Sequence, residues 1–267
     1  MNYLKNLYRI ITPNIIRKVI FLLRRILFNP KGVLFQNNNS YNEDGLATNH
    51  IVDFLKDEKF IKNYSKAAEG TKHRIMFRAY IINYYANYAL RLFNNNQGCF
   101  AELGTHKGLM SKMILLNNHF NEKINFYLFD TFTGIPLENI RDDEIRHVKK
   151  MNKNFYNEDV YEFVKSKFSD FPFIKIVKGH LPDTLINENI SLENIQFLHI
   201  DLNNAHAEIE SIKILYDKIL KGAPVILDDY CYSETYRPQK DAWDKFANEK
   251  GFQILSLPTG QGLFLKI

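Results

Sequence analysis

Short apolar segments alternate with amphipathic segments from residue 98 to the end of this 267-residue sequence, and this alternation constrains the fold most strongly. Segments with the length of buried strands lie at 98–103, 125–130, 173–178, 196–201, 224–228, 252–257 and 262–267. Helical patterns lie between them, near 106–118, 158–168, 206–220 and 239–250. Strands that alternate with helices predict a parallel sheet covered by helices on both faces.

The last two predicted strands are separated only by the turn Pro258-Thr259-Gly260-Gln261. Parallel neighbours need a connection of a dozen or more residues, so this pair must be an antiparallel hairpin. We therefore expect an α/β, Rossmann-like sheet of seven strands, in which six are parallel and the last is antiparallel. Residues 43–95, including the aromatic-rich stretch 77–92, predict a helical cap, so that residues 43–267 form one domain.

The first 42 residues differ from the rest in charge. They contain seven lysines and arginines and no acidic residue, whereas the remaining residues contain 28 basic and 30 acidic side chains. The stretch 14–28 has the pattern of a basic amphipathic helix, and 37–40 reads as a linker. The apolar runs within residues 14–28 are too short to span a bilayer. Two interpretations stay open for this N-terminal helical extension: residues 1–30 contact an anionic membrane surface, or the helix packs on protein.

The composition of the sequence excludes further classes of protein. A chain with 45% hydrophobic and 14% aromatic residues can bury a sizeable core, which excludes a disordered protein. Residues 43–267 are slightly acidic and lack the positive net charge of a typical nucleic-acid-binding protein, so no nucleic acid is expected as a partner. Two cysteines are too few for a disulfide framework and fit a reducing, cytoplasmic compartment. If residues 1–30 bind lipid, we expect the protein at the inner face of the membrane.

Polar residues stand at the carboxyl ends of the predicted parallel strands, where sheets of this kind bind ligands. Four of the five ends carry a carboxylate, and a ring of carboxylates is hard to explain as separate helix caps. The residues at these ends are Glu102, Gly104, Asp130, Gly179, His180, Asp201, Asp228 and Asp229.

The turn after the first strand of this sheet, Glu102 to Gly108, is similar to a dinucleotide-binding turn but lacks G-x-G-x-x-G. Gly104 permits the tight turn and Gly108 a close helix approach. The Glu102 carboxylate favours a positively charged cofactor such as S-adenosylmethionine over the pyrophosphate of NAD. Asp130 can accept hydrogen bonds from both hydroxyls of a ribose, or it is a turn aspartate.

Three further carboxylates, those of Asp201, Asp228 and Asp229, are expected to converge because adjacent strands lie about 4.8 Å apart. Converging carboxylates repel one another unless they are protonated or bridged by a cation. Ligand sets made of oxygen suit Mg²⁺, Ca²⁺ or Mn²⁺. The alternative is two helix caps and one buried aspartate. His199, inside a strand, is expected to be a hydrogen-bonded structural histidine.

In this order, the motifs resemble the macrocin O-methyltransferase family of class I S-adenosylmethionine-dependent methyltransferases. The matching stretches span about residues 98–267 and read FAELGTHKGLMSK, FYLFDTFTGIP, VKGHLPDTL, IQFLHIDLNNAHAEIESIKILYDKILKGAPVILDDY and LPTGQGLFLK. The family commonly has a second acid and a tyrosine after the aspartate that corresponds to Asp201. Here Asn203 and Asn204 follow instead, which leaves the substrate open.

The resemblance implies methyl transfer to a sugar hydroxyl of a glycan or glycosylated metabolite, with Mg²⁺ as a second cofactor. It implies that Asp201, Asp228 and Asp229 hold the metal. It implies a cofactor site around Glu102, Gly104 and Asp130, to which we add Thr105, Gly108, Thr131, Gly179 and His180. A homodimer is expected on the resemblance alone.

Deprotonation of a sugar hydroxyl requires a base, and Asp201 and His206 are the two candidates. Tyr230, Tyr232 and Arg237 follow the acidic pair and, with Gln261 in the last turn, are expected to contact the sugar. The long segment 131–172 is either a lid or a solvated insertion. The alternative functions are an inactive scaffold of the same fold and an O-methyltransferase for a small molecule without sugar.

Overall fold

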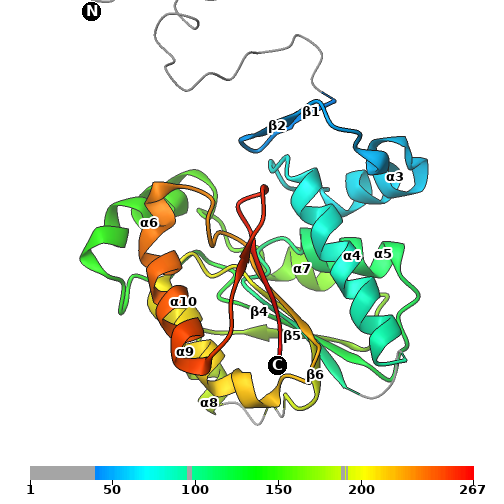
Figure 1. Cartoon of the computed structure of the whole chain (residues 1–267). Coiled ribbons are helices and arrows are strands. Elements are labelled where there is room, and N and C mark those ends of the chain that lie inside the picture. The colour runs from blue at the N-terminus through cyan, green and yellow to red at the C-terminus, as the bar shows by residue number, and fades with distance from the viewer. Residues whose placement is uncertain (1–39, 95–97, 188–189, 191) are drawn as a thin grey trace, which may run out of the picture. The chain divides into compact units, whose positions relative to one another are not determined.

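The computed structural model describes residues 40–94, 98–187, 190 and 192–267, of which Tyr41–Ile267 form one compact unit. The basic arm predicted within residues 1–42 therefore lies almost entirely outside the described residues. Within this compact unit, a seven-stranded sheet separates two layers of helices (Figure 1). The strand order is β5-β4-β3-β6-β7-β9-β8. The strands are β3 (Cys99–Leu103), β4 (Asn125–Asp130), β5 (Ile174–Lys178), β6 (Ile195–Ile200), β7 (Pro224–Leu227), β8 (Leu255–Ser256) and β9 (Gly262–Leu265).

The predicted strand directions are confirmed. Strand β9 pairs antiparallel with both β7 and β8, and it lies between them. The other six strands therefore run in one direction. In chain order, the strands extend from β3 through β4 to β5 on one side of the sheet, and then from β6 outward to β8 on the other side. This reversal creates a switch point between β3 and β6, at which the carboxyl ends of the strands open a crevice.

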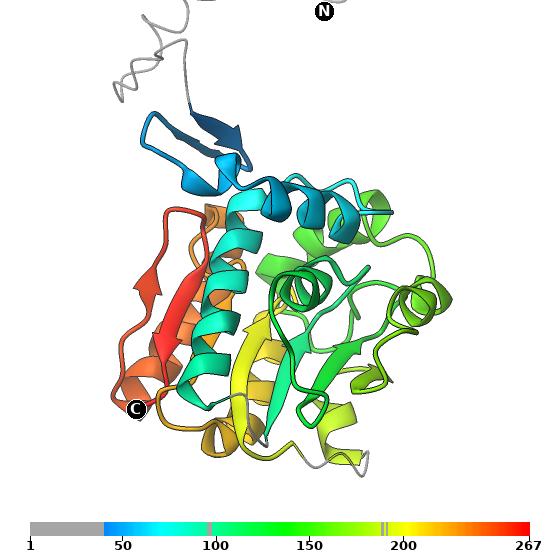
Figure 2. The ribbon, with the colours of Figure 1, turned by 90° about the vertical axis from the view of Figure 1, so that its right-hand side faces the viewer.

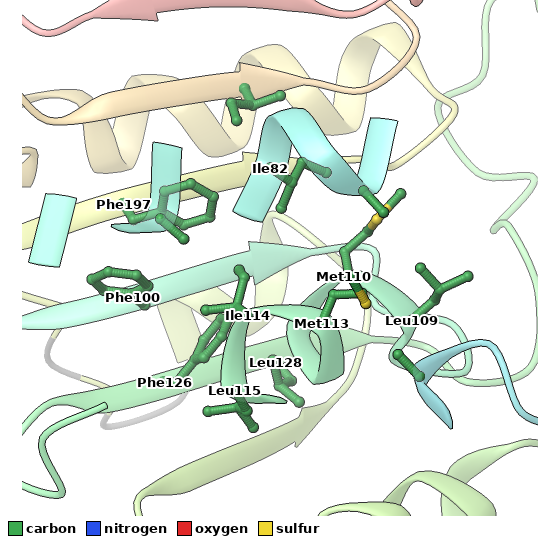
Figure 3. Packing of buried hydrophobic residues seen from close by; sticks show 14 of the residues in the cluster. Ile82, Phe100, Leu109, Met110, Met113, Ile114, Leu115, Phe126, Leu128 and Phe197 are labelled. Carbon is green, nitrogen blue, oxygen red and sulfur yellow. The ribbon is translucent and has the colours of Figure 1, made fainter. Parts of the chain in front are cut away.

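Alternate residues of the strands pack against different helical layers. Figure 3 shows Phe100, Phe126 and Phe197 under α4 (Met76–Leu92) and α5 (Leu109–Asn117), in contact with Ile82 and Ile114. The opposite face of the sheet packs against α9 (Ala205–Leu215) and α10 (Arg237–Lys250) through a second cluster that contains Leu198, Ile212 and Trp243. Both faces are buried, which explains why the strands are almost continuously apolar.

The cap differs from the expectation of helices throughout residues 43–95. A hairpin of β1 (Tyr41–Glu43) and β2 (Leu46–Thr48) precedes η1 (Asp53–Lys56) and α3 (Glu58–Ala67). Asp44 and Gly45 form its turn with φ angles of 51° and 75°. An Asp-Gly pair favours such a turn because both residues tolerate positive φ. Figure 2 shows the hairpin and α3 next to the start of α4.

The long connection between β4 and β5 contains α6 (Asp142–Asn154) and α7 (Tyr161–Lys167). Shorter elements complete the unit: α8 (Asp183–Asn187), η2 (Tyr216–Lys218) and η3 (Glu234–Tyr236). The helix predicted over 206–220 ends earlier, as η2 follows α9 directly. No helix among the described residues is long and apolar enough to cross a membrane.

Candidate active site

A cavity of about 1030 Å³, a volume that includes its open mouth, lies at the carboxyl ends of β3, β4, β5 and β6. The topology accounts for its position, since these ends meet at the switch point. Several of the predicted site residues line it together: Gly104, Asp130, Thr131, Gly179, His180, Asp201 and His206.

Gly104 brings the turn after β3 against the end of β6. Its φ is +91°, and a Cβ atom there would lie 1.8 Å from the carbonyl oxygen of Asp201. Its backbone N–H donates to the carbonyl of Phe129 at 2.8 Å. Only glycine fits this backbone conformation and this close approach, as the sequence predicts.

Asp130 joins two turns at the floor of the cavity. One carboxylate oxygen accepts the backbone N–H of His106 at 2.7 Å, and the other accepts the N–H of Phe132 at 2.6 Å. Burial raises the pKa of Asp130, and these two hydrogen bonds oppose the rise. A carboxylate oxygen accepts more than one hydrogen bond, so Asp130 retains acceptor capacity toward the cavity.

The charge of the cavity is one-sided. Five carboxylate side chains line it, and no lysine or arginine is found among its described lining residues, although Lys107 outside the lining pairs with Glu158. The five are Asp130, Glu138, Glu158, Asp183 and Asp201. A lining of this kind attracts a cationic ligand and repels a pyrophosphate.

The connection between β4 and β5 builds one wall of this cavity. Ile135 and Tyr156 line it, and both backbone polar groups of Ile135 bond to the Asn152 side chain at 2.8 Å. The Tyr156 ring packs edge-on against His106, with 4.8 Å between ring centroids. Burial lowers the pKa of His106 to about 4, so this ring is neutral at physiological pH. The segment is therefore part of the site.

Asp201 and His206, the two candidate bases, both line the cavity. The Asp201 carboxylate accepts a hydrogen bond from the Asn203 amide at 2.9 Å. Burial, together with the charges of Asp228 and Asp229, raises the pKa of Asp201 well above its usual value. His206 lies in the first turn of α9 and is exposed.

Glu102, which the sequence analysis assigns to the cofactor site, does not line the cavity. Its register partner on β6 is His199, and the His199 Nδ1 atom lies 3.0 Å from a Glu102 carboxylate oxygen. The Ser111 hydroxyl of α5 donates to the other oxygen. The side chain points under α5 because Glu102 shares a strand face with Phe100. Thr105 and Gly108 are likewise not in the lining; a Cβ atom on Gly108 would meet the Phe168 ring at 2.4 Å.

His199 is the structural histidine that the sequence predicts. It bridges Glu102 and Asp228, whose carboxylate oxygen lies 3.4 Å from Nε2. Burial lowers the pKa of His199, but the hydrogen bonds and charges of the two carboxylates outweigh it and raise the pKa to about 10. The imidazole is therefore a buried cation at neutral pH.

The expected metal centre of Asp201, Asp228 and Asp229 does not form in this structure. Asp228 and Asp229 are paired with Arg78 of α4, whose Nη1 atom lies 2.6 Å and 3.0 Å from their carboxylate oxygens. Among the described residues, no three His, Cys, Asp or Glu side chains are arranged to hold a metal ion. Arg78 was not predicted, and a lone arginine in an aromatic helix is its only sequence signal.

The predicted substrate residues also lie outside the cavity lining. Tyr230 is buried and bonds to Asp244 and Lys240, and Gln261 is buried and donates to Asp228 at 2.8 Å. Two more are held by neighbours: Tyr232 donates to Asp44 at 2.9 Å, and Arg237 pairs with Glu234 on the surface. These contacts give all four side chains a structural partner.

Comparison with known proteins agrees with the geometry. The sequence profile of the macrocin-O-methyltransferase (TylF) family matches residues 85–255. No curated protein matches the sequence.

Solved structures share the fold. The O-methyltransferase NovP gives a TM-score of 0.59 at 18% identity, over 78% of this chain and 88% of NovP. CalS11, a calicheamicin methyltransferase also described as a TDP-rhamnose 3'-O-methyltransferase, gives 0.54 at 14% identity, over 86% and 99%. A putative caffeoyl-CoA O-methyltransferase from Staphylococcus aureus gives 0.52 at 16% identity, over 80% and 98%.

Proposed function

Because this chain belongs to the macrocin O-methyltransferase family and is an S-adenosylmethionine-dependent O-methyltransferase, we propose that its acceptor is a sugar hydroxyl of a glycan or glycosylated metabolite. One fold neighbour, CalS11, is described as acting on TDP-rhamnose, which supports a sugar acceptor. The observation that carries the cofactor assignment is the acidic cavity at the switch point, with no lysine or arginine in its described lining.

The residues in the cavity fit S-adenosylmethionine, which supplies an electrophilic methyl group when it is bound. Asp130 has acceptor capacity for ribose hydroxyls, and Gly104 allows close approach to the backbone. Thr131, Gly179 and His180 complete this part of the lining. The carboxylates favour the sulfonium and ammonium charges of the cofactor electrostatically.

Asp201 and His206 are our candidates for the base that takes the proton of the acceptor hydroxyl. Asp201 lines the cavity, and burial raises its pKa, which makes its carboxylate a stronger base than an ordinary aspartate. His206 is the alternative because it lines the same cavity. Asp201→Asn and His206→Gln distinguish them: the variant that lowers kcat while binding the cofactor normally identifies the base.

Calorimetric titration with S-adenosylmethionine and S-adenosylhomocysteine tests the cofactor site. We expect Asp130→Ala to weaken binding by about 100-fold, since it removes charge-assisted acceptors of about 1.5–3 kcal/mol. Asp159→Ala is the matched control, because this exposed carboxylate pairs with Lys178 and does not line the cavity. Equal affinity in wild type and Asp130→Ala, or no binding by wild type, would contradict the assignment.

The acceptor is tested with a radiolabelled methyl donor. TDP-rhamnose is the sugar probe, and caffeoyl-CoA represents an acceptor whose reacting hydroxyl is phenolic, which the Staphylococcus aureus neighbour favours. Transfer to sugar probes alone supports the proposal. Transfer only to caffeoyl-CoA would favour the alternative.

We place the reaction in the cytoplasm, as the cysteine content predicts, and a homodimer remains a proposal for light scattering to test.

A further inference from the structure

Arg78 is a buried cation at the centre of a carboxylate cluster. Its side chain is 5% exposed, and those of Asp228 and Asp229 are 6% and 10% exposed. Besides its two ion pairs with them, Nη1 donates to the carbonyl oxygen of Asp228 at 2.9 Å. On the other side, Nε donates to the Asp44 carboxylate at 2.7 Å. One guanidinium therefore joins three carboxylates.

Arg78 is held in this position by two segments of the chain. Asp44 comes from the β1–β2 turn, and Asp228 and Asp229 follow β7. Tyr232 closes the arrangement, because its ring lies 4.4 Å from the guanidinium carbon and its hydroxyl donates to Asp44 at 2.9 Å. Arginine keeps its charge at every physiological pH, so this cation is permanent.

Both Asp228 carboxylate oxygens that a divalent ion would need are already engaged. One carboxylate oxygen of Asp228 accepts from Arg78, and the other accepts from the Gln261 amide at 2.8 Å and lies 3.4 Å from His199 Nε2. An ion at Asp228 and Asp229 would have to displace these donors. It would also lie against the guanidinium, and two cations at such a short distance repel each other strongly.

We infer that Arg78 takes the place of the divalent cation in this O-methyltransferase: its guanidinium neutralises and positions Asp228 and Asp229, so that cofactor binding and methyl transfer need no added metal. The inference rests on the proposed function, because it concerns the same site. Arg78 is a positioning residue in this view, since it acts through the two aspartates.

Manganese is the probe, because bound Mn²⁺ loses its six-line electron paramagnetic resonance signal and the ion accepts the same oxygen ligands as Mg²⁺. Full-length wild-type protein is titrated beside Arg78→Ala, Arg78→Gln and Arg78→Lys. We expect Arg78→Ala and Arg78→Gln to bind Mn²⁺ about 10–100-fold more tightly than wild type, the range over which metal sites respond to neighbouring groups. Arg78→Lys keeps a cation and should bind as weakly as wild type.

Adding Asp228→Asn to Arg78→Gln should abolish the gained site. Tight Mn²⁺ binding by wild type that Asp228→Asn weakens would overturn the inference. So would the absence of a gained site in both Arg78→Ala and Arg78→Gln, since Arg78 would then not occupy a cation position.

S-adenosylmethionine affinity, measured on the same samples with and without EDTA, separates this inference from the proposed function. Wild type should bind the cofactor equally well in both. Cofactor binding that disappears in EDTA overturns the inference and leaves the methyltransferase assignment intact. No cofactor binding under either condition overturns the proposed function, whatever the manganese result.

Discussion

Replacing His199 with glutamine is expected to remove a pH-dependent part of the stability of this protein. His199 is 1% exposed and lies between Glu102 and Asp228, which raise its pKa to about 10. The unfolded chain restores the ordinary value of about 6.5. Because the folded pKa is the higher one, the stabilisation is complete below pH 6.5 and is lost as the pH rises through 10.

The size of the effect follows from the two pKa values. A difference of about 3.5 pH units at 1.36 kcal/mol each corresponds to about 5 kcal/mol in total. Between pH 6.5 and 9.0, the free energy of unfolding of wild type should therefore fall by about 3 kcal/mol relative to His199→Gln. Taking the difference between the two proteins cancels other titrating groups, such as Lys167, whose pKa burial and neighbouring Lys112 lower to about 8.

Urea unfolding at several pH values between 6.0 and 9.5 measures this difference. His50→Gln, which changes an exposed histidine, is the matched control. A wild-type minus His199→Gln difference that stays constant with pH would refute the reasoning, because it would mean that the buried imidazole is neutral. Proton nuclear magnetic resonance of the imidazole gives an independent check of its protonation.

Further outcomes follow from other contacts. Gly104→Ala should weaken S-adenosylmethionine binding in calorimetry, because its Cβ atom would lie 1.8 Å from the carbonyl oxygen of Asp201, and unchanged affinity would contradict this role. Trp243→Phe should lower the free energy of unfolding by about 1–3 kcal/mol, measured with urea, because the Trp243 Nε1 bond to buried Glu208 at 2.7 Å is lost. Replacing the four basic residues within 14–28 by glutamine in the full chain should abolish flotation with anionic liposomes if the arm binds membrane; equal flotation would argue for packing on protein.

The sequence predicts the sheet well because its signals are local. Each buried strand is short, apolar and followed by a helical pattern, and the turn 258–261 is too short for a parallel crossover. The β1–β2 hairpin escapes the same reasoning, since its strands have three residues each and little apolar periodicity. Its one strong signal is the pair Asp44-Gly45, a favoured hairpin turn.

The site is predictable only where topology alone brings residues together. Asp130 and Asp201 end parallel strands, so their meeting at the switch point follows from the fold class. Arg78 lies 150 positions from Asp228, on a helix of the cap, and strand order says nothing of that contact. The strand-end rule does not fix the direction of the Glu102 side chain, because a residue one position from a strand end can face either helical layer. It shares a face with Phe100, so α5 covers it.

The carboxylates at the carboxyl end of the sheet fall into two groups, those that stabilise the fold and those that line the cofactor cavity. Asp228 and Glu102 are buried outside the cavity lining, where an unpaired charge is costly, and His199 and Arg78 supply the compensating cations there. Asp130 and Asp201 line the cavity and pair with no lysine or arginine of the described lining. The compensated carboxylates join β3, the end of β7 and α4 through buried ion pairs, and the carboxylates of the cavity lining favour a cationic cofactor. A cation introduced beside Asp228 and Glu102 would therefore disturb the fold, whereas one introduced into the cavity would compete with the cofactor.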